Sequence, residues 1–374
     1  MNVRGAVLRE MGLPAPYAET RPLEVMELEL DGPGPGELLV RIGAAGLCHS
    51  DLSVIDGSRP RVMPMVLGHE AAGEVVEVGP GVTDIAVGDR VVMTFVPSCG
   101  HCTPCLSGRA ALCEPGAAAN AAGELLGGGR RWRDLDGRPL HHHLGVSAFA
   151  DHVVVSERSA VKVPSELPFD VAAVFGCAVL TGAGAVLHSA HVAPGDSVAV
   201  FGLGGVGLAA VLGAVAAGAS TVVAVDVVDA KLELARELGA THAVKAGPDA
   251  VTEIRDLTGG GPDKAVETVG SEKVLADAYA ATRRGGVTVT VGLPHPDRML
   301  SIPAVSLVAE ERTLRGSYLG SSVPARDLPR FIDLFRGGHL PVDRLLTHRL
   351  SLDEVNEGFD RLARGEAVRQ AIVF

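Results

Sequence analysis

The hydrophobic pattern of roughly the first 165 residues is that of β structure. Short runs of apolar or alternating residues are separated by glycine and proline, at Glu37–Gly43, Ala72–Gly79, Gly88–Met93 and Asp151–Val155. Such runs between turn residues are typical of strands. We therefore predict a twisted antiparallel barrel or sandwich for this part of the chain.

The pattern changes near Pro164 and Pro168, after which Val171–His188 is predicted as helix and linker. Further on, strand-like runs alternate with helix-compatible segments; these runs are Ser197–Phe201, Thr221–Asp226, Lys264–Val269 and Gly286–Gly292. This alternation favours one parallel, doubly wound sheet. A helix at Asp327–Arg336 and a last strand at Gln370–Phe374 are expected to return to the first domain. The predicted fold class is thus α/β, with a β-rich domain at 1–178 and 322–374 and a coenzyme domain at 179–321.

A glycine-rich turn follows the first of these strand-like runs. Gly202, Gly204 and Gly207 lie between that strand and a segment of helix formers, which is the context of a dinucleotide-binding fingerprint. The amides of the following helix N-terminus would attract the phosphates. Asp226 ends the next strand 24 residues after Gly202, where a carboxylate accepts hydrogen bonds from ribose hydroxyls and repels a 2′-phosphate. The pattern therefore predicts NAD rather than NADP.

Two other interpretations of this segment exist. The 29 residues from Ser197 to Val225 carry no charge and are long enough to span a bilayer. Glycine turns divide them, however, and no basic flank or second span accompanies them. The other alternative is a glycine turn in an unrelated α/β protein, which the flanking strands and the placed acid disfavour.

Composition narrows the classes of partner. A chain of 374 residues is long enough for two domains, and its formal net charge of −12 argues against nucleic acid or an anionic membrane as a partner. Aromatic residues make up only 3% of the chain, so base-stacking platforms are not expected. The sequence after Met1 has no apolar signal core, and a cytoplasmic protein is therefore expected.

Four of the six cysteines lie within fifteen residues, at Cys99, Cys102, Cys105 and Cys113. In a cytosolic chain such clustering indicates a metal rather than disulfides. Four thiolates at these spacings can surround one tetrahedral zinc ion, which would be structural because no position is left for substrate. A four-iron cluster is the main alternative, although the last gap of seven residues differs from the usual ferredoxin spacing. Four reduced cysteines without a metal remain as the simplest alternative, and His101 is expected to face solvent.

Several motifs occur in an order that resembles the zinc-dependent, medium-chain alcohol dehydrogenases. They are the segments Gly46–Asp51 and Gly68–Gly79, the four-cysteine lobe and the glycine turn. The resemblance covers nearly the whole chain. It implies a GroES-like catalytic domain, a Rossmann coenzyme domain, and an active site in the cleft between them.

The resemblance also implies roles for individual residues. Cys48, His69 and Cys177 look like catalytic zinc ligands, Glu70 like a carboxylate that can approach the metal, and Asp51 like the acid that orients the histidine ligand. Ser50 would relay the alcohol proton toward the coenzyme ribose. The expected coenzyme contacts are Thr181 and Val206 at nicotinamide, Asp226 and Lys231 at the adenosine ribose, and His49 and Arg369 at pyrophosphate. The implied cofactors are two zinc ions per chain and NAD.

Other positions depart from the family pattern or concern the substrate. Many relatives complete the proton relay with a histidine where this chain has Ser53, which leaves the proton exit open. Arg59 stands where the glutathione-dependent formaldehyde branch typically has an acid. The expected substrate pocket is lined by Phe95, His143, Leu293 and Tyr318. The run His141–His143 is alternatively a solvated loop edge, and residues 116 to 140 are expected to form a long basic loop.

The leading hypothesis is an NAD-dependent zinc alcohol dehydrogenase that oxidises a primary or aryl alcohol to the aldehyde, reversibly. One alternative is a thiol-dependent formaldehyde dehydrogenase that acts on an S-hydroxymethyl thiol. Another, of a different class, is a non-catalytic dinucleotide-binding protein with structural zinc. Small alcohols or aldehydes are the expected partners. The apolar segment Met299–Val308 could supply an edge strand between subunits, so a homodimer is expected, with a tetramer as the alternative.

Overall fold

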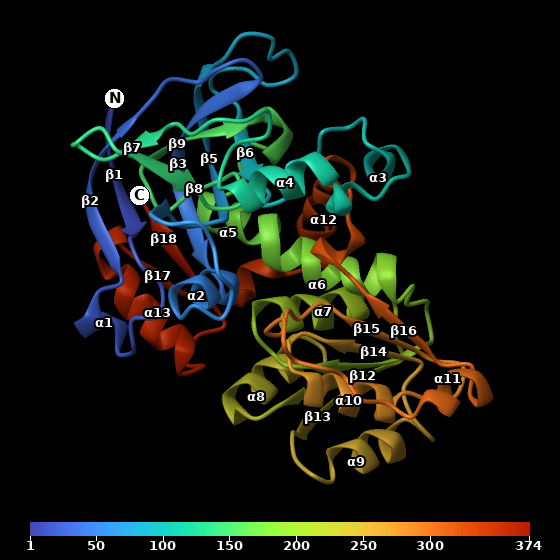
Figure 1. The fold of residues 1–374 in the computed structure, drawn as a ribbon. Helices are drawn as coiled ribbons and strands as arrows, with labels where there is room; N and C mark the ends of the chain where they lie inside the picture. Colours follow the sequence, from blue (N-terminus) through green and yellow to red (C-terminus); the bar gives the residue numbers. More distant parts are fainter. The chain divides into compact units, whose positions relative to one another are not determined.

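The computed structural model describes all residues from 1 to 374 (Figure 1). The chain forms two compact units. The first contains Met1–Cys177, Val323–Pro329 and Leu346–Phe374, and the second contains Ala178–Ser322 and Arg330–Leu345. Helix α12 (Pro324–Arg336) thus begins in the first unit and ends in the second. The domain limits expected from the sequence stay a prediction.

The first unit is built from two β systems. Five strands close a barrel in the order β1 (Asn2–Leu8), β2 (Leu23–Leu30), β7 (Trp132–Arg133), β8 (Pro139–His142), β4 (Met65–Val66). The second sheet has the order β10 (Ala160–Val163), β6 (Arg90–Met93), β5 (Glu70–Val78), β3 (Glu37–Leu47), β18 (Arg369–Val373), β17 (Leu346–Leu350), and β9 (His152–Ser156) also pairs with β3. Most pairs are antiparallel, as the alternating pattern predicted; β4 with β8 and β17 with β18 are parallel.

Short helices complete the first unit. They are α1 (Tyr17–Thr20), α2 (His49–Ile55), α3 (Thr103–Leu106), α4 (Glu114–Ala122), α5 (Phe169–Val174) and α13 (Val355–Ala363). The prediction of a long loop over residues 116 to 140 is wrong, because α4, β7 and part of β8 lie there. Its basic residues are paired as well: Arg131 makes two hydrogen bonds with the Glu37 carboxylate, at 2.8 and 3.0 Å. Trp132, which follows Arg131 in the chain, is fully buried.

The second unit is a parallel sheet with helices packed around it (Figure 1). Its strand order is β13 (His242–Lys245), β12 (Thr221–Asp226), β11 (Ser197–Phe201), β14 (Lys264–Glu267), β15 (Val287–Thr290), β16 (Thr313–Gly316). The connecting helices are α6 (Leu180–Gly184), α7 (Gly205–Ala216), α8 (Asp229–Glu237), α9 (Ala250–Leu257), α10 (Glu272–Ala281) and α11 (Ala304–Ala309). All five strand pairs are parallel, and the chain order reverses at β11, as in a doubly wound Rossmann sheet.

The expected edge strand at Met299–Val308 is wrong. Ala304–Ala309 forms α11, and the edge of the sheet is the next segment, β16. Apolar residues on α11 remain at the surface all the same, with Val305 71% and Val308 82% exposed. A run of apolar residues after a proline fits either element, so the pattern alone does not decide between helix and strand.

One helical segment is long and apolar enough to cross a membrane by length and composition. Phe169–Ser189 has 21 residues and a mean hydropathy of 1.9, and 89% of its most apolar window is buried inside the protein. A segment buried to this extent packs inside the protein as a core helix. The uncharged stretch Ser197–Val225, weighed above as a span, instead forms β11, the glycine turn, α7 and β12.

Candidate functional site

Cys48, His69 and Cys177 come from three separate elements of the first unit. Cys48 follows β3 and is the residue before α2, His69 lies between β4 and β5, and Cys177 lies in the helical segment after α5. All three are buried, and one ligand atom of each lies within 4.8 Å of the others. The donor atoms of a tetrahedral zinc at about 2.3 Å are roughly 3.8 Å apart. The three side chains are thus gathered at the scale of a metal centre.

Two further observations test whether these residues fit zinc. His69 Nε2 is buried and has no partner in the protein, so this ring atom is free to bind a metal. The pKa of the Cys48 thiol lies well below its usual range, first because Cys177 donates a hydrogen bond to it and then because Arg369 and His69 stabilise the thiolate. A thiol with a lowered pKa beside an imidazole nitrogen without a hydrogen-bond partner is a donor set that suits zinc with one open position.

Asp51 holds two of these three residues. Its Oδ1 lies 2.9 Å from His69 Nδ1, and its Oδ2 accepts the backbone N–H of Cys48 at 3.1 Å. Burial alone would raise the pKa of Asp51, but His69 and His143 outweigh it and keep the pKa below its usual value. The ionised carboxylate therefore fixes the proton of His69 on Nδ1 and leaves Nε2 as the ligand atom.

Glu70 and Arg369 form a buried ion pair beside the two thiols. Arg369 also donates to the backbone oxygen of Leu47 at 3.2 Å. Glu70 packs so closely on β3 that a Cβ at Gly46 would lie 2.3 Å from Glu70 Oε1. The pyrophosphate contact expected of Arg369 stays a prediction, since its guanidinium group interacts here with Glu70, the Leu47 backbone and the Cys48 sulfur.

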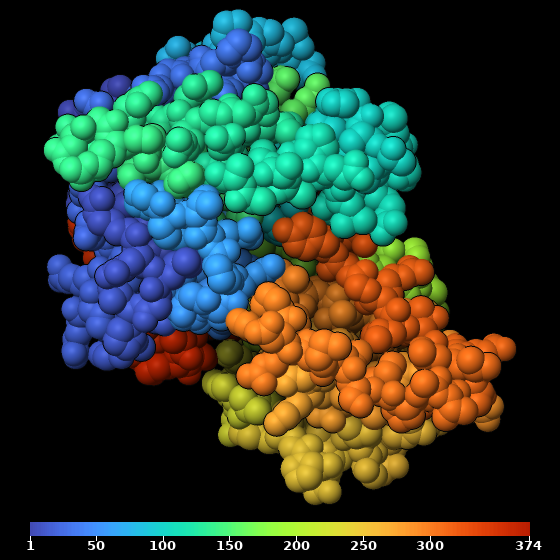
Figure 2. All heavy atoms as spheres, in the orientation of Figure 1, coloured from blue at the N-terminus to red at the C-terminus, as the bar shows by residue number.

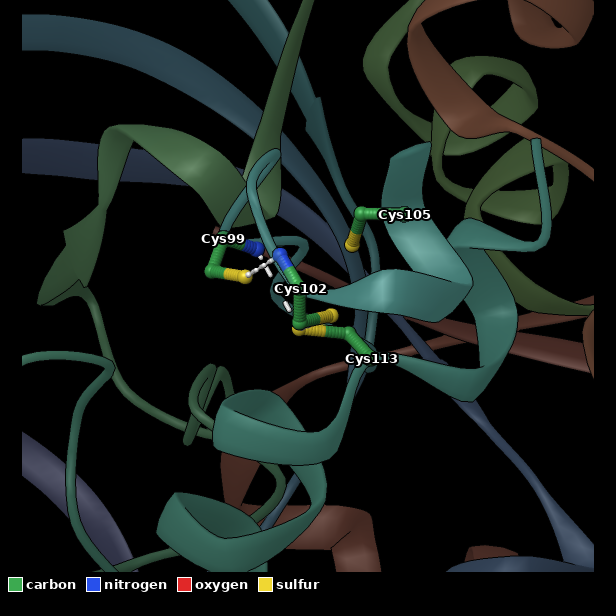
Figure 3. Close-up of side chains that lie close together, drawn as sticks. All are labelled: Cys99, Cys102, Cys105 and Cys113. Carbon is green, nitrogen blue, oxygen red and sulfur yellow. Dashed lines mark hydrogen bonds between the residues drawn. The ribbon is translucent and has the colours of Figure 1, made fainter. Parts of the chain in front are cut away.

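The four remaining cysteines form a separate cluster in a lobe of the first unit. Figure 3 shows Cys99, Cys102, Cys105 and Cys113 with their sulfur atoms turned toward one another, and one ligand atom of each lies within 4.8 Å of the others. Backbone N–H groups point at the sulfurs, from Cys99 and Gly116 to Cys113 at 3.2 and 3.4 Å and from Cys102 to Cys99 at 3.3 Å. Amide donors stabilise thiolates, as a closed four-sulfur zinc site requires. His101 is exposed.

The backbone of the glycine turn in the second unit allows close approach, of the helix on one side and of a ligand on the other. Gly202 has a φ of +88°. A Cβ at Gly207 would lie 1.8 Å from the Gly202 oxygen, whereas a Cβ at Gly204 would meet no heavy atom within 4 Å. Gly207 is therefore needed for close packing of the helix on the turn, and Gly204 borders open space on the side where the fingerprint predicts the pyrophosphate.

Asp226 has a role that the sequence interpretation missed. Its Oδ2 accepts the backbone N–H of Leu203 at 2.6 Å, and its Oδ1 accepts that of Val228 at 2.9 Å. The side chain therefore ties β12 to the glycine turn. Each carboxylate oxygen has a further lone pair for a ribose hydroxyl, so the predicted ribose contact is compatible with this role.

The other predicted site residues divide between the two units. Ser50 and His49 begin α2, and Ser53 Oγ donates to the His49 backbone oxygen at 2.8 Å. Thr181, Val206, Lys231, Leu293 and Tyr318 belong to the second unit. In the first unit, the Phe95 ring meets the His69 ring edge to face at 5.5 Å. His142 and His143 are buried, so the solvated-edge interpretation of this histidine run is wrong.

Known proteins resemble the chain throughout its length. A family model described as "Alcohol dehydrogenase GroES-like domain" matches residues 34–165, and one described as "Zinc-binding dehydrogenase" matches residues 205–336. An NDMA-dependent alcohol dehydrogenase of Amycolatopsis methanolica is 40% identical over 385 residues, covering 100% of this chain and 99% of the relative.

An S-(hydroxymethyl)glutathione dehydrogenase of Paracoccus denitrificans is 38% identical, with 100% of both chains covered. The crystal structure of benzyl alcohol dehydrogenase from Acinetobacter calcoaceticus superposes with a TM-score of 0.93 at 32% identity, covering 100% of this chain and 99% of that one. The chain belongs to the zinc-dependent medium-chain alcohol dehydrogenase family.

Family membership settles the broad chemistry. The protein is a zinc-dependent oxidoreductase for small alcohols or aldehydes, with zinc and a nicotinamide coenzyme as cofactors. The hypothesis of a non-catalytic dinucleotide-binding protein is therefore set aside. Its β-rich first unit and parallel second unit correspond to the GroES-like and Rossmann folds of the family.

Proposed function

We propose that this dehydrogenase oxidises a primary or aryl alcohol to the aldehyde with NAD, at a zinc held by Cys48, His69 and Cys177. The observation that carries the proposal is the convergence of these three buried side chains, with His69 Nε2 left without a protein partner. The aryl-alcohol specificity is supported by the likeness to benzyl alcohol dehydrogenase and by the Phe95 ring beside His69.

The roles of the protein groups follow from their contacts. Zinc, when bound, acts as a Lewis acid that lowers the pKa of the substrate hydroxyl. Asp51 orients the imidazole of His69 and holds the backbone at Cys48, so two ligands are placed through one carboxylate. Arg369 compensates the charge of Glu70, which would otherwise stand unbalanced beside Cys48 and Cys177.

The alcohol proton leaves through the chain's own hydroxyl groups. Ser50, on the first turn of α2, is the group proposed to accept it. Ser53 cannot continue the relay as a histidine would, because its hydroxyl hydrogen is engaged by the His49 oxygen and its pKa is far above neutral. We therefore propose that the proton passes from Ser50 to solvent, or through His49.

A second candidate is oxidation of an S-hydroxymethyl thiol, supported by the full-length likeness to S-(hydroxymethyl)glutathione dehydrogenase. Arg59 argues against it, since the glutathione-dependent formaldehyde branch typically has an acid at this position. A requirement for a low-molecular-weight thiol would distinguish the two activities.

The test follows NAD reduction by absorbance with benzyl alcohol, hexanol, geraniol, ethanol and formaldehyde with and without glutathione, and measures zinc on the same sample. We expect two zinc ions per chain and turnover of benzyl alcohol without thiol. Cys48→Ala should lose one zinc and the activity, whereas Ser58→Ala, on the loop after α2, should keep both. Turnover only in the presence of thiol would favour the second candidate, and one zinc in the wild type would refute the catalytic site.

The oligomeric state and location belong to the same proposal. The proposed location is the cytoplasm. The open edge of β16 and the exposed apolar face of α11 favour a homodimer formed by the second unit. Figure 2 shows this part of the chain, in orange, at the surface. Val308→Asp should shift the sedimentation coefficient from dimer to monomer, whereas a monomeric wild type would contradict the proposal.

A further inference from the structure

His143 lies against the second coordination sphere of the proposed zinc site. Its Nδ1 is 3.2 Å from Asp51 Oδ1, the same oxygen that lies 2.9 Å from His69 Nδ1. The two imidazole rings meet edge to face at 87°, with their centroids 5.6 Å apart. His143 and Asp51 are both buried, with 1% and 0% of their surfaces exposed. One carboxylate is thus shared by two imidazoles, of which only one has a ligand role.

The backbone around His143 is tightly fixed. The His143 N–H donates to Ser147 Oγ at 2.8 Å, and its carbonyl accepts the N–H groups of Val146 and Ser147 at 3.0 and 3.2 Å. Leu144 and Ser147 have φ values of +52° and +57°, which non-glycine residues adopt at a cost of about 1 kcal/mol or more. Such a conformation persists where the surrounding contacts determine it.

The same turn is joined to the segment that carries His69. Ala148 donates to the Gly68 oxygen and Phe149 to the Leu67 oxygen, both at 3.0 Å. These backbone hydrogen bonds tie the segments of His143 and His69 together, and both side chains face Asp51. A buried carboxylate needs several donors to stay ionised, and Cys48 N–H, His69 and His143 are protein groups that surround it.

We infer that His143 is a positioning residue for the catalytic metal: its Nδ1–H restrains the Asp51 carboxylate, which in turn orients His69. This inference rests on the proposed ligand role of His69. The approach of His143 is less well aligned than that of His69, so the stronger hydrogen bond remains with the ligand and His143 acts on the orientation of the carboxylate. Neither ring nitrogen of His143 has a partner with full hydrogen-bond geometry, so the 3.2 Å approach of Nδ1 to Asp51 Oδ1 is a close electrostatic contact.

The experiment compares three variants of His143 that change either its hydrogen-bond donor or the size of its side chain. His143→Asn keeps an N–H near the position of Nδ1, while His143→Leu and His143→Phe keep apolar or aromatic bulk without it. His141→Leu is the matched control, since this neighbouring half-buried histidine contacts Arg130 and not Asp51. Zinc release is measured by chelator competition, with the four-cysteine zinc as the internal reference, and Co²⁺ is then placed in the emptied site for its absorption spectrum.

Loss of a partner in the second coordination sphere commonly weakens metal binding 10- to 100-fold. We expect the lower part of that range, about 10-fold, for His143→Leu and His143→Phe, with a shifted Co²⁺ spectrum and an unchanged lobe zinc. His143→Asn and His141→Leu should stay within about threefold of the wild type. Melting temperatures identify any variant that fails to fold, for which the second apolar variant serves instead.

Several outcomes would overturn the inference. Wild-type zinc affinity and spectrum in both apolar variants would show that His143 does not act on the metal, and equal losses in His143→Asn would show that only packing matters. A third metal per chain would mean that Asp51, His69 and His143 themselves bind an ion. One zinc in the wild type would refute the proposed catalytic site, and this inference with it.

Discussion

Gly204→Ala, in the turn after β11, should weaken coenzyme binding and leave the stability of the fold nearly unchanged. The backbone at Gly204 has φ −74° and ψ −173°, which alanine adopts without strain, and its Cβ would meet no protein atom within 4 Å. Replacing glycine by alanine at a compatible position gains about 0.4–1 kcal/mol, and alanine before a helix loses a similar amount. The free energy of unfolding should therefore change by less than about 1 kcal/mol.

The effect on binding should be much larger. The Cβ would occupy the open space beside the N-terminus of α7, where the pyrophosphate is expected to approach the backbone. Losing one hydrogen bond to a charged group costs about 1.5–3 kcal/mol. At about 1.4 kcal/mol per factor of ten, Gly204→Ala should raise the Kd for NADH roughly 10- to 100-fold.

Gly207→Ala supplies the contrast. Its Cβ would lie 1.8 Å from the Gly202 oxygen and 2.8 Å from the Gly202 carbonyl carbon, and both are backbone atoms that cannot rotate away. Overpacking against such rigid atoms should cost about 3 kcal/mol, the upper end of the usual range. For a unit of this size that corresponds to a fall in melting temperature of roughly 6–12 °C.

Both quantities are measured on the zinc-loaded protein, by NADH fluorescence titration and by thermal unfolding. Binding of NADH to Gly204→Ala within twofold of the wild type would refute the assignment of this space to the coenzyme. A wild-type melting temperature in Gly207→Ala would refute the packing argument.

Three further predictions concern acid stability, the zinc lobe and coenzyme choice. Burial lowers the pKa of His142 to about 3, so the unfolded chain binds its proton near pH 6.5 while the folded protein does not. The contribution of His142 to the free energy of unfolding is therefore fully present above about pH 6.5 and falls toward pH 3, by roughly 2 kcal/mol at pH 5. Between pH 7 and pH 5, the free energy of unfolding measured with urea should fall less in His142→Gln than in the wild type. An equal fall in both would contradict the lowered pKa. Cys113→Ser should reduce the metal content from two zincs to one and expose the lobe to proteolysis, and retention of two would contradict a four-sulfur site. Asp226→Asn keeps an oxygen for a backbone N–H but removes the charge, so the preference for NAD over NADP should fall at least tenfold in kcat/KM, whereas an unchanged ratio would show that another group sets it.

Local sequence determined the elements in which neighbouring residues interact. The run from β11 through the glycine turn to β12 was predictable because strand, turn and helix signals follow one another within thirty residues. The cysteine lobe was predictable for the same reason, since two-residue gaps place successive sulfurs on one centre. The alternation of strands and helices likewise fixed the parallel sheet.

Only the tertiary structure brought distant residues together. Cys48, His69 and Cys177 lie on a strand end, a turn and a helix, and no spacing rule links them; the family resemblance alone suggested the set. The contact of His143 with Asp51 and the backbone bonds of Asp226 left no sequence signal, because each depends on how separate segments pack. The apolar run before β16 forms a helix rather than the expected strand, and its apolar pattern did not distinguish the two. Sequence periodicity shows which positions are apolar, whereas the contacts between distant residues are set by the tertiary structure.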